Sequence, residues 1–209
     1  MKPGRFITLE GGEGTGKSTL VAGLSAALRE RNIGCMVTRE PGGTPLAESV
    51  REIALHPPKG HSWSPLAQAL LMNAAREDHL ERQIRPALRK GHWVFCDRFA
   101  DSTRAYQSID GAPMSVLMAF EAAVVGDTRP DLTLILDAPP EQIAQRRLTR
   151  GTSDAFEAKD IGFHVAVRAA FLTIAKDEPD RCVVIDALQA PDAVLAAALA
   201  TISERVGMT

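Results

Sequence analysis

Five short apolar runs recur along this chain, and a longer stretch of helical character separates each run from the next. The runs cover residues 5–9, 35–38, 93–96, 132–136 and 182–185. Apolar runs of this length, without polar alternation, are typical of strands buried on both faces of a parallel sheet. Strands that alternate with helices place those helices over the two faces. The sequence therefore predicts a three-layer α/β fold with a five-stranded parallel sheet.

The stretches between the runs have the spacing of amphipathic helices. Leucines recur every four residues in 18–31, and residues 65–89 carry leucine and isoleucine at helical spacing, beginning with Leu66 and Leu70. The Pro- and Gly-rich pieces are short enough to be loops, and 209 residues fit one domain. We expect residues 1–209 to form a single domain.

Composition excludes two classes of partner. With 24 Lys and Arg against 26 Asp and Glu, the chain lacks the basic excess that binding a nucleic-acid polymer requires. The longest apolar stretch, 194–202, is too short to span a bilayer, so we expect no membrane association. Cys35, Cys96 and Cys182 lie far apart, as expected for buried thiols in a reducing compartment. These features favour a cytoplasmic protein.

A glycine-rich motif lies between the first apolar run and the first helical stretch. Residues 11–18 match G-x-x-x-x-G-K-[ST], the phosphate-binding loop of P-loop proteins. Backbone N–H groups and the positive end of the following helix bind phosphate in such loops, and Lys17 reaches the outer phosphates. Ser18 is the expected Mg²⁺ ligand. The predicted ATP-binding residues are Gly11, Gly12, Glu13, Gly14, Thr15, Gly16, Lys17 and Ser18.

The motif alone leaves the reaction open among a GTPase switch, an ATP-driven motor and a small-molecule kinase. Neither Asn32 nor Asn73 is followed by Lys, and no Asp-x-x-Gly occurs, which argues against a Ras-type GTPase. A motor would be larger or carry a coupling signature. The kinase interpretation is favoured.

The apolar runs 93–96 and 132–136 are each followed by an aspartate, and either acid fits a magnesium site by pattern. Asp97 is followed by Arg98, which puts a cation beside the metal, whereas Asp137 is followed by Ala-Pro-Pro and is expected to cap the next helix. We therefore predict that Asp97 and Ser18 hold the metal.

Several segments together resemble the bacterial thymidylate kinases over nearly the whole chain. Arg-Glu-Pro-Gly-Gly-Thr and Asp-Arg-x-x-x-Ser-x-x-Ala-Tyr-Gln are specific to that family. The segments that carry the resemblance are 7–14, 38–44, 74–76, 97–107 and 129–133. The resemblance implies transfer of the γ-phosphoryl group of MgATP to dTMP, giving dTDP and ADP, by a homodimer.

The resemblance also implies roles for the acceptor-binding residues. Glu13 would accept a hydrogen bond from the 3′-hydroxyl, and Arg76 would donate to a thymine carbonyl. Arg98 would hold the acceptor phosphate, and Tyr106 would pack where a 2′-hydroxyl would sit. Ser102, Thr103 and Gln107 would line the base pocket. The alternatives are a solvated loop acid for Glu13, surface ion pairs for the arginines and a core ring for Tyr106.

Arg39 and the lid are further features that the resemblance implies. Arg39 begins a Pro-Gly-Gly loop, either near the acceptor phosphate or as a surface arginine at an ordinary turn. Residues 146–160 resemble the mobile lid, in which Arg147 binds ATP and Arg150 acts on the transferring phosphoryl group. Lys17, Asp97 and Arg98 are expected to act on the transferring phosphoryl group too. A basic helix end also favours arginine through the helix dipole, so the alternative is that two of Arg146, Arg147 and Arg150 are structural, with Arg150 the one expected to act.

The chain departs from the family pattern at two positions. Met72 stands where the family has a Phe that stacks on thymine, and Ala155 stands where related lids have an arginine. A sulfur contact is weaker than base stacking, so thymine selectivity is less firmly specified than the reaction. A kinase for another nucleoside monophosphate or for a deoxynucleoside therefore stays open, as does a nucleotide-dependent binding switch. Residues 119–125 offer a small-residue face that suits either a dimer interface or the core.

Overall fold

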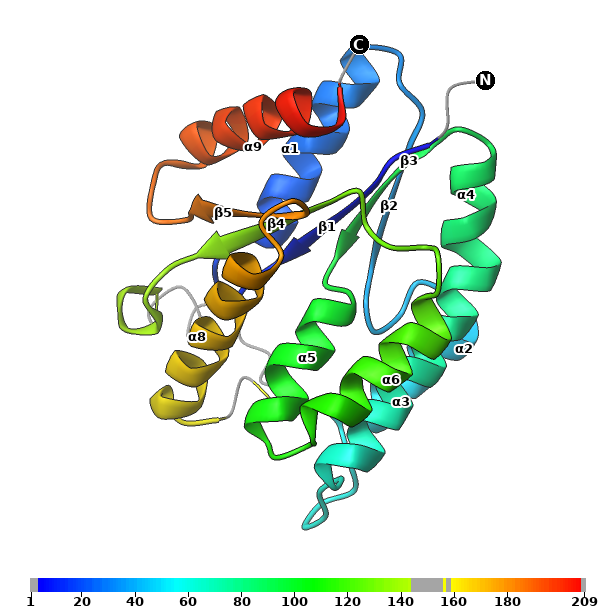
Figure 1. The fold of residues 1–209 in the computed structure, drawn as a ribbon, viewed down its shortest axis with the longest axis vertical. Coiled ribbons are helices and arrows are strands. Elements are labelled where there is room, and N and C mark those ends of the chain that lie inside the picture. Colours follow the sequence, from blue (N-terminus) through cyan, green and yellow to red (C-terminus); the bar gives the residue numbers. More distant parts are fainter. Residues whose placement is uncertain (1–3, 144–155, 157–158, 208–209) are drawn as a thin grey trace.

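The computed structural model describes residues 4–143, 156 and 159–207. Its centre is one sheet in the order β2-β3-β1-β4-β5, and every neighbouring pair is parallel (Figure 1). The strands are β1 (Phe6–Glu10), β2 (Cys35–Arg39), β3 (Trp93–Asp97), β4 (Leu132–Asp137) and β5 (Cys182–Asp186). Each strand ends one residue beyond its predicted apolar run, so the five-stranded parallel sheet is confirmed.

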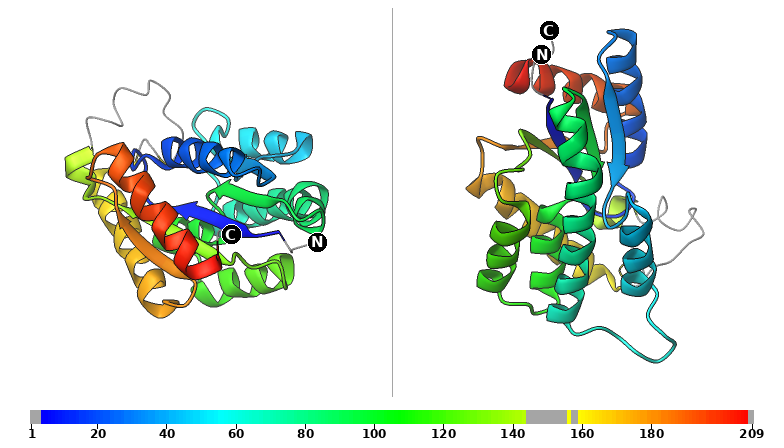
Figure 2. Two further views of the ribbon diagram at one scale, coloured as in Figure 1. Left: turned by 90° about the horizontal axis from the view of Figure 1, so that it is seen from above. Right: turned by 90° about the vertical axis from the view of Figure 1, so that its right-hand side faces the viewer.

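Helices cover both faces of this sheet (Figure 2). On one face lie α1 (Lys17–Glu30) and α9 (Pro191–Val206). The opposite side holds α3 (Pro65–His79), α4 (Arg85–Arg89), α5 (Ala100–Ile109), α6 (Met114–Val125) and α8 (Ile161–Asp177). Helix α2 (Pro45–Leu55) packs against α3. In β1, Ile7 and Leu9 pack with the α1 and α9 side, and Phe6 packs with the other. Successive side chains of a strand point to opposite faces of the sheet, so β1 contributes to a separate hydrophobic core on each face.

Residues 65–89 are helical throughout, but they do not form the one regular helix that the spacing predicts. A π-helical turn, η1 (Leu80–Ile84), separates α3 from α4, and Arg85 N–H donates to the carbonyl of Leu80. The next residue, Pro86, has no N–H and its ring crowds the preceding turn, which accounts for the widened backbone there.

The apolar side chains at the start of α3 point outward, which sequence spacing does not reveal. Leu66 and Leu70 are 42% and 51% exposed. The buried side of α3 instead carries Met72, Arg76 and His79, because this side faces a pocket and a polar cluster.

The described part of the chain contains no helix long and apolar enough to cross a membrane. All three cysteines are free thiols. Cys96 and Cys182 are buried as expected, whereas Cys35 on the edge strand β2 is only partly buried.

Candidate active site

The glycine-rich loop connects β1 directly to α1. Gly11 has a φ of +126°, and a Cβ there would lie 2.3 Å from the carbonyl oxygen of Leu136, so a larger residue does not fit. Lys17 Nζ donates to the carbonyls of Gly11 and Gly12 at 3.1 and 2.9 Å. Burial, with Arg98 nearby, lowers the pKa of Lys17. The loop thus holds a buried cation at the start of a helix, as a phosphate site requires.

Of the aspartates that end β3 and β4, the one that ends β3 faces this loop. Ser18 Oγ donates to Asp97 Oδ2 at 3.0 Å. The Asp137 carboxylate instead accepts hydrogen bonds from Nε and Nη2 of Arg168 at 2.7 and 2.9 Å. The helix-capping role expected for Asp137 is therefore not what the structure shows, since its carboxylate is occupied by an arginine of α8.

Arg98 lies between the loop and α5. Its φ is +70°, a conformation that a bulky residue adopts only where its surroundings fix the backbone. Its Nη1 donates to Gly11 O and Ser102 Oγ, both at 3.1 Å, and its Nη2 pairs with the Glu13 carboxylate. The acids around it raise its pKa although burial opposes the charge. Arg98 is thus a fixed cation beside the phosphate loop and not a surface ion-pair partner.

Glu10, which the sequence analysis did not single out, anchors the start of α5. Its carboxylate accepts from Phe99 N at 2.7 Å, Ser102 N at 3.2 Å and Ser102 Oγ at 2.6 Å. Burial, and then the charge of Asp101, raise its pKa to about 7, although Arg98 opposes the rise. The strand that leads into the loop is therefore tied to the helix that follows Arg98.

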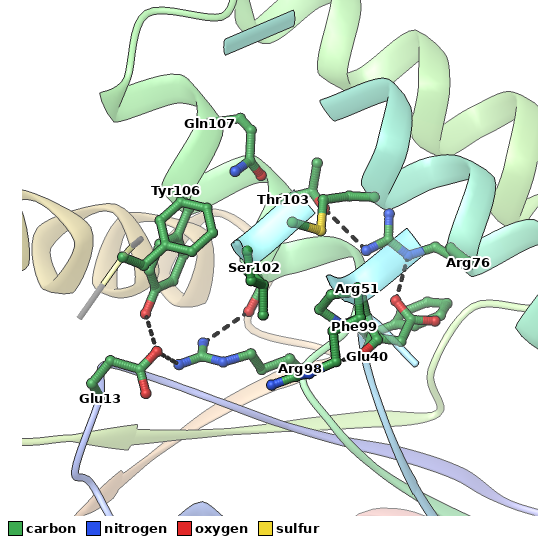
Figure 3. Close-up of a pocket in the computed structure, with 14 residues that line it drawn as sticks. Glu13, Glu40, Arg51, Arg76, Arg98, Phe99, Ser102, Thr103, Tyr106 and Gln107 are labelled. Carbon is green, nitrogen blue, oxygen red and sulfur yellow. Dashed lines mark hydrogen bonds and ion pairs between the residues drawn. The ribbon is translucent and has the colours of Figure 1, made fainter. Parts of the chain in front are cut away.

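Beside the loop opens a pocket (Figure 3). It lies between α2, α3 and α5, and Figure 3 shows the polar side chains converging on it from these elements. The pocket brings together Glu13, Met72, Arg76, Arg98, Ser102, Thr103, Tyr106 and Gln107, all of which the resemblance assigned to the acceptor.

Arg76 and Tyr106 lie at two sides of this pocket. Arg76 is 3% exposed, and its Nε donates to Glu40 Oε2 at 2.8 Å. The Tyr106 hydroxyl donates to Glu13 Oε1 at 3.3 Å, and its ring packs edge-on against Phe156 with centroids 5.1 Å apart. Burial raises the pKa of Tyr106, so its hydroxyl stays protonated. Tyr106 is therefore both a core ring and a pocket residue.

Comparison with known proteins decides the family. The family model described as Thymidylate kinase matches residues 9–198. A thymidylate kinase from Caulobacter vibrioides is 51% identical over 209 residues, the whole of both chains. One from Bradyrhizobium diazoefficiens is 47% identical and is matched over 90% of its length by 97% of this chain.

The chain belongs to the thymidylate kinase family. A crystal structure of thymidylate kinase from Ehrlichia chaffeensis superposes with a TM-score of 0.75 at 34% identity. The match covers 96% of this chain and 99% of that one, so the likeness extends over the whole fold.

Of the acceptor residues assigned by resemblance to the thymidylate kinases, Arg39 alone does not line this pocket. Its side chain is 56% exposed and pairs with Glu48 at 3.0 Å. It borders a neighbouring hollow near Ser18 and Asp97. The peptide bond between Glu40 and Pro41 in this loop is cis.

Several pocket residues of this thymidylate kinase chain were missed from the sequence. Arg51 on α2 donates to the carbonyl of Pro41 at 2.9 Å and lines both the pocket and the hollow beside the loop. Glu40 and Phe156 also line the pocket. Glu40 and Arg51 lie in or just after the Arg-Glu-Pro-Gly-Gly-Thr segment, which was the available signal.

The lid of the thymidylate kinases falls largely outside the described residues. Arg146, Arg147, Arg150 and Ala155 all lie in the part of the chain that the structure does not describe. Their roles therefore stay predictions.

Proposed function

We propose that this chain transfers the γ-phosphoryl group of MgATP to dTMP, giving dTDP and ADP. The observation that carries the proposal is that the phosphate-loop hollow and the acceptor pocket adjoin. Glu13, Arg51 and Arg98 line both of them. Two phosphate groups bound in these neighbouring spaces are within reach of one another, which is the main requirement of direct phosphoryl transfer.

The oxygen atoms of Ser18 and Asp97 suit Mg²⁺, a hard cation that binds few protein groups besides phosphates and water. Their 3.0 Å separation fits two ligands of one ion. Magnesium bound there would neutralise charge on the ATP phosphates.

The chain's own residues supply positioning and fixed positive charge. Lys17 Nζ lies at the loop, where it binds the outer phosphates of ATP, and Arg98 binds the acceptor phosphate. An oxygen of the dTMP phosphate attacks the γ-phosphorus, the bond to the bridging oxygen breaks, and ADP leaves without a covalent enzyme intermediate. Arg147 and Arg150 are proposed to add charge from the lid, by resemblance to the family.

Recognition of the nucleoside uses the rest of the pocket. Arg76 offers N–H groups to a ring carbonyl, with Ser102, Thr103 and Gln107 around the base. Glu13 accepts from the 3′-hydroxyl, and the Tyr106 ring occupies the space of a 2′-hydroxyl. Met72 lines the pocket in place of a stacking aromatic.

A second copy of this chain is the proposed partner. Met114 and Met118 on α6 are 45% and 36% exposed, and α3, which packs against α6, exposes Leu66 and Leu70. These two adjoining helices present apolar side chains that a homodimer would bury. Sedimentation equilibrium tests this, with a monomer at micromolar concentration contradicting it. The free thiols support the proposed cytoplasmic location.

Met72 favours a second candidate, a kinase with broader choice of base, because its flexible side chain does not fix a ring plane. A binding switch of another class would hydrolyse ATP slowly without an acceptor. ADP formation is measured without an acceptor and then with dTMP, dUMP, dCMP, dAMP or thymidine in turn. The rates distinguish a dTMP kinase, a kinase with broader choice of base and a binding switch. We expect dTMP to give the highest rate; preference for another acceptor or indifference to all would overturn the proposal.

A further inference from the structure

The pocket arginine Arg76 is the end of a buried chain of hydrogen bonds that starts at the edge of the sheet. We propose that His79 is a positioning residue for base recognition, because it fixes Glu40 and, through Glu40, the guanidinium of Arg76. This inference rests on the proposed function of the pocket. His79 acts without direct contact with the substrate, since it does not line the pocket.

His79 is the last residue of α3 and is fully buried. Its Nδ1 lies 3.1 Å from Glu40 Oε1, and its Nε2 lies 2.7 Å from Thr38 Oγ1. A carboxylate only accepts, so Nδ1 must carry the hydrogen in this contact. In the neutral ring the Thr38 hydroxyl then donates to Nε2, which assigns the tautomer from its partners. His79 is thus held from both sides.

Glu40 passes this constraint to Arg76. The Glu40 side chain is 4% exposed, and its second oxygen accepts from Arg76 Nε at 2.8 Å. The same guanidinium donates to Asn73 Oδ1 at 3.1 Å and Thr103 Oγ1 at 3.0 Å. Among the described residues these contacts use three of the five N–H donors of an arginine. One N–H on each terminal nitrogen remains for the pocket that Arg76 lines (Figure 3).

The cluster also includes Cys96, and its ligand atoms with those of Glu40 and His79 lie within 4.8 Å of one another. The arrangement suits a hydrogen-bond chain better than a metal site. The Glu40 and His79 atoms already pair with Arg76 and Thr38, and Cys96 Sγ donates to the carbonyl of Arg98 at 3.0 Å. Burial raises the pKa of Cys96, which disfavours the thiolate that binds metals.

Close packing around His79 supports this chain of hydrogen bonds. Gly43 has a φ of +90°, and a Cβ there would lie 2.4 Å from His79 Nε2. The Pro-Gly-Gly loop therefore has a glycine where the imidazole approaches it. The loop and the end of α3 are therefore closely packed, and Arg76 lies on the same helix as His79.

Three substitutions of His79 separate its two hydrogen bonds. His79→Asn places an amide nitrogen near the position of Nδ1 and keeps a donor for Glu40. His79→Gln places an amide oxygen near Nε2 and keeps only the Thr38 contact, and His79→Leu removes both. We expect Leu and Gln to raise KM for dTMP about 10- to 100-fold, as for a displaced charge-assisted hydrogen bond, with kcat nearly unchanged. Asn should stay within about threefold of wild type, and exposed His61→Leu serves as the matched control.

Analogues of dTMP that lack one ring carbonyl distinguish positioning from general loosening. For the analogue without the carbonyl that Arg76 reads, wild type and His79→Leu should have the same KM. An equal increase of KM for dTMP and for both carbonyl-deleted analogues would overturn the proposal, as would a rescue by Gln but not by Asn.

A measurement on the ligand-free protein tests the inference independently of the proposed function. The Nε–H signal of Arg76 in ¹⁵N NMR spectra should exchange slowly with solvent in wild type and in His79→Asn. In His79→Leu this signal should exchange at least about tenfold faster. A thermal melt of the variant checks that it is folded under the conditions of the NMR measurement. Unchanged exchange would overturn the inference. Failure of wild type to phosphorylate dTMP would overturn only the proposed function.

Discussion

The hydroxyl of Ser18 donates a 3.0 Å hydrogen bond to Oδ2 of Asp97, although 79 positions separate the two residues. β1 and β3 are parallel neighbours, so the loop after β1 and the end of β3 meet at one edge of the sheet. Ser18 lies in the first turn of α1, directly after the loop. The pair therefore depends on strand order, and it locates the proposed magnesium site.

Asp97→Asn should lower kcat by at least about 10²-fold, the order expected for loss of one preorganised electrostatic group. It should also raise the Mg²⁺ concentration needed for half-maximal activity. Asp137→Asn is the matched control, because Asp137 ends the next-but-one strand in the sheet yet pairs with Arg168. Titration of Mg²⁺ in an ADP-release assay compares them. Equal magnesium dependence of the two variants would contradict the assignment.

Choice of sugar should follow from the contact between Tyr106 and Glu13. We expect kcat/KM for the 3′-deoxy analogue of dTMP to fall about 10- to 100-fold, because Glu13 loses its donor. The ribose analogue should be excluded by the Tyr106 ring, and this exclusion should persist in Tyr106→Phe, which keeps the ring. Steady-state kinetics with the three nucleotides test this. Equal kcat/KM for all of them would remove the sugar-reading role of both residues.

Met72→Phe should lower KM for dTMP by up to about tenfold, which corresponds to about 1.4 kcal/mol. An aromatic ring gives the base a defined stacking plane, and kcat should change little because stacking helps ground state and transition state alike. Met72 is 7% exposed, so the competing outcome is overpacking that costs about 1–3 kcal/mol of stability. Unchanged KM with a lowered melting temperature would mean that the side chain does not touch the base.

Glu10 should make the free energy of unfolding depend on pH. Its pKa of about 7 in the folded protein lies above the ordinary value of 4.5, so the native state binds more protons between these values. Stability should therefore fall as pH rises from about 4.5 to about 7, by roughly 3–4 kcal/mol at about 1.4 kcal/mol for each pKa unit.

Urea unfolding at several pH values compares wild type with Glu10→Gln, which carries no charge at any pH. The slope between pH 5 and 7 should be smaller in the variant. Glu204→Gln, at an exposed position of α9, should keep the wild-type slope. Identical slopes for wild type and Glu10→Gln would show that this carboxyl does not titrate in that range.

The local sequence pattern was enough to predict the strands of the sheet and the phosphate loop. A strand buried on both faces is mostly apolar, so residues 93–96, Trp-Val-Phe-Cys, are recognisable as a strand without knowledge of their neighbours. The loop at 11–18 is contiguous, and the groups proposed to bind phosphate are its own backbone N–H groups and Lys17. Features whose physical cause is confined to a few adjacent residues are therefore readable from the sequence.

The orientation of whole elements needed the tertiary structure. The spacing of Leu66 and Leu70 indicates a helix face but not what covers it, and the structure places both outward. The same spacing did not predict the π-helical turn before Pro86. An amphipathic pattern specifies that one face differs from the other, whereas the neighbouring elements decide which face is buried.

The sequence by itself predicted the fold class, the phosphate loop between β1 and α1 and, through family motifs, many of the residues that line the pocket beside this loop. Only the tertiary structure decided that Arg39 pairs with Glu48 outside the pocket and that Arg51 lines it. It also decided the partners of Glu40 and His79, which are 39 positions apart. A buried polar side chain must find its partner wherever the crossing of strands and helices brings one, and that meeting is set by three-dimensional packing and not by local spacing.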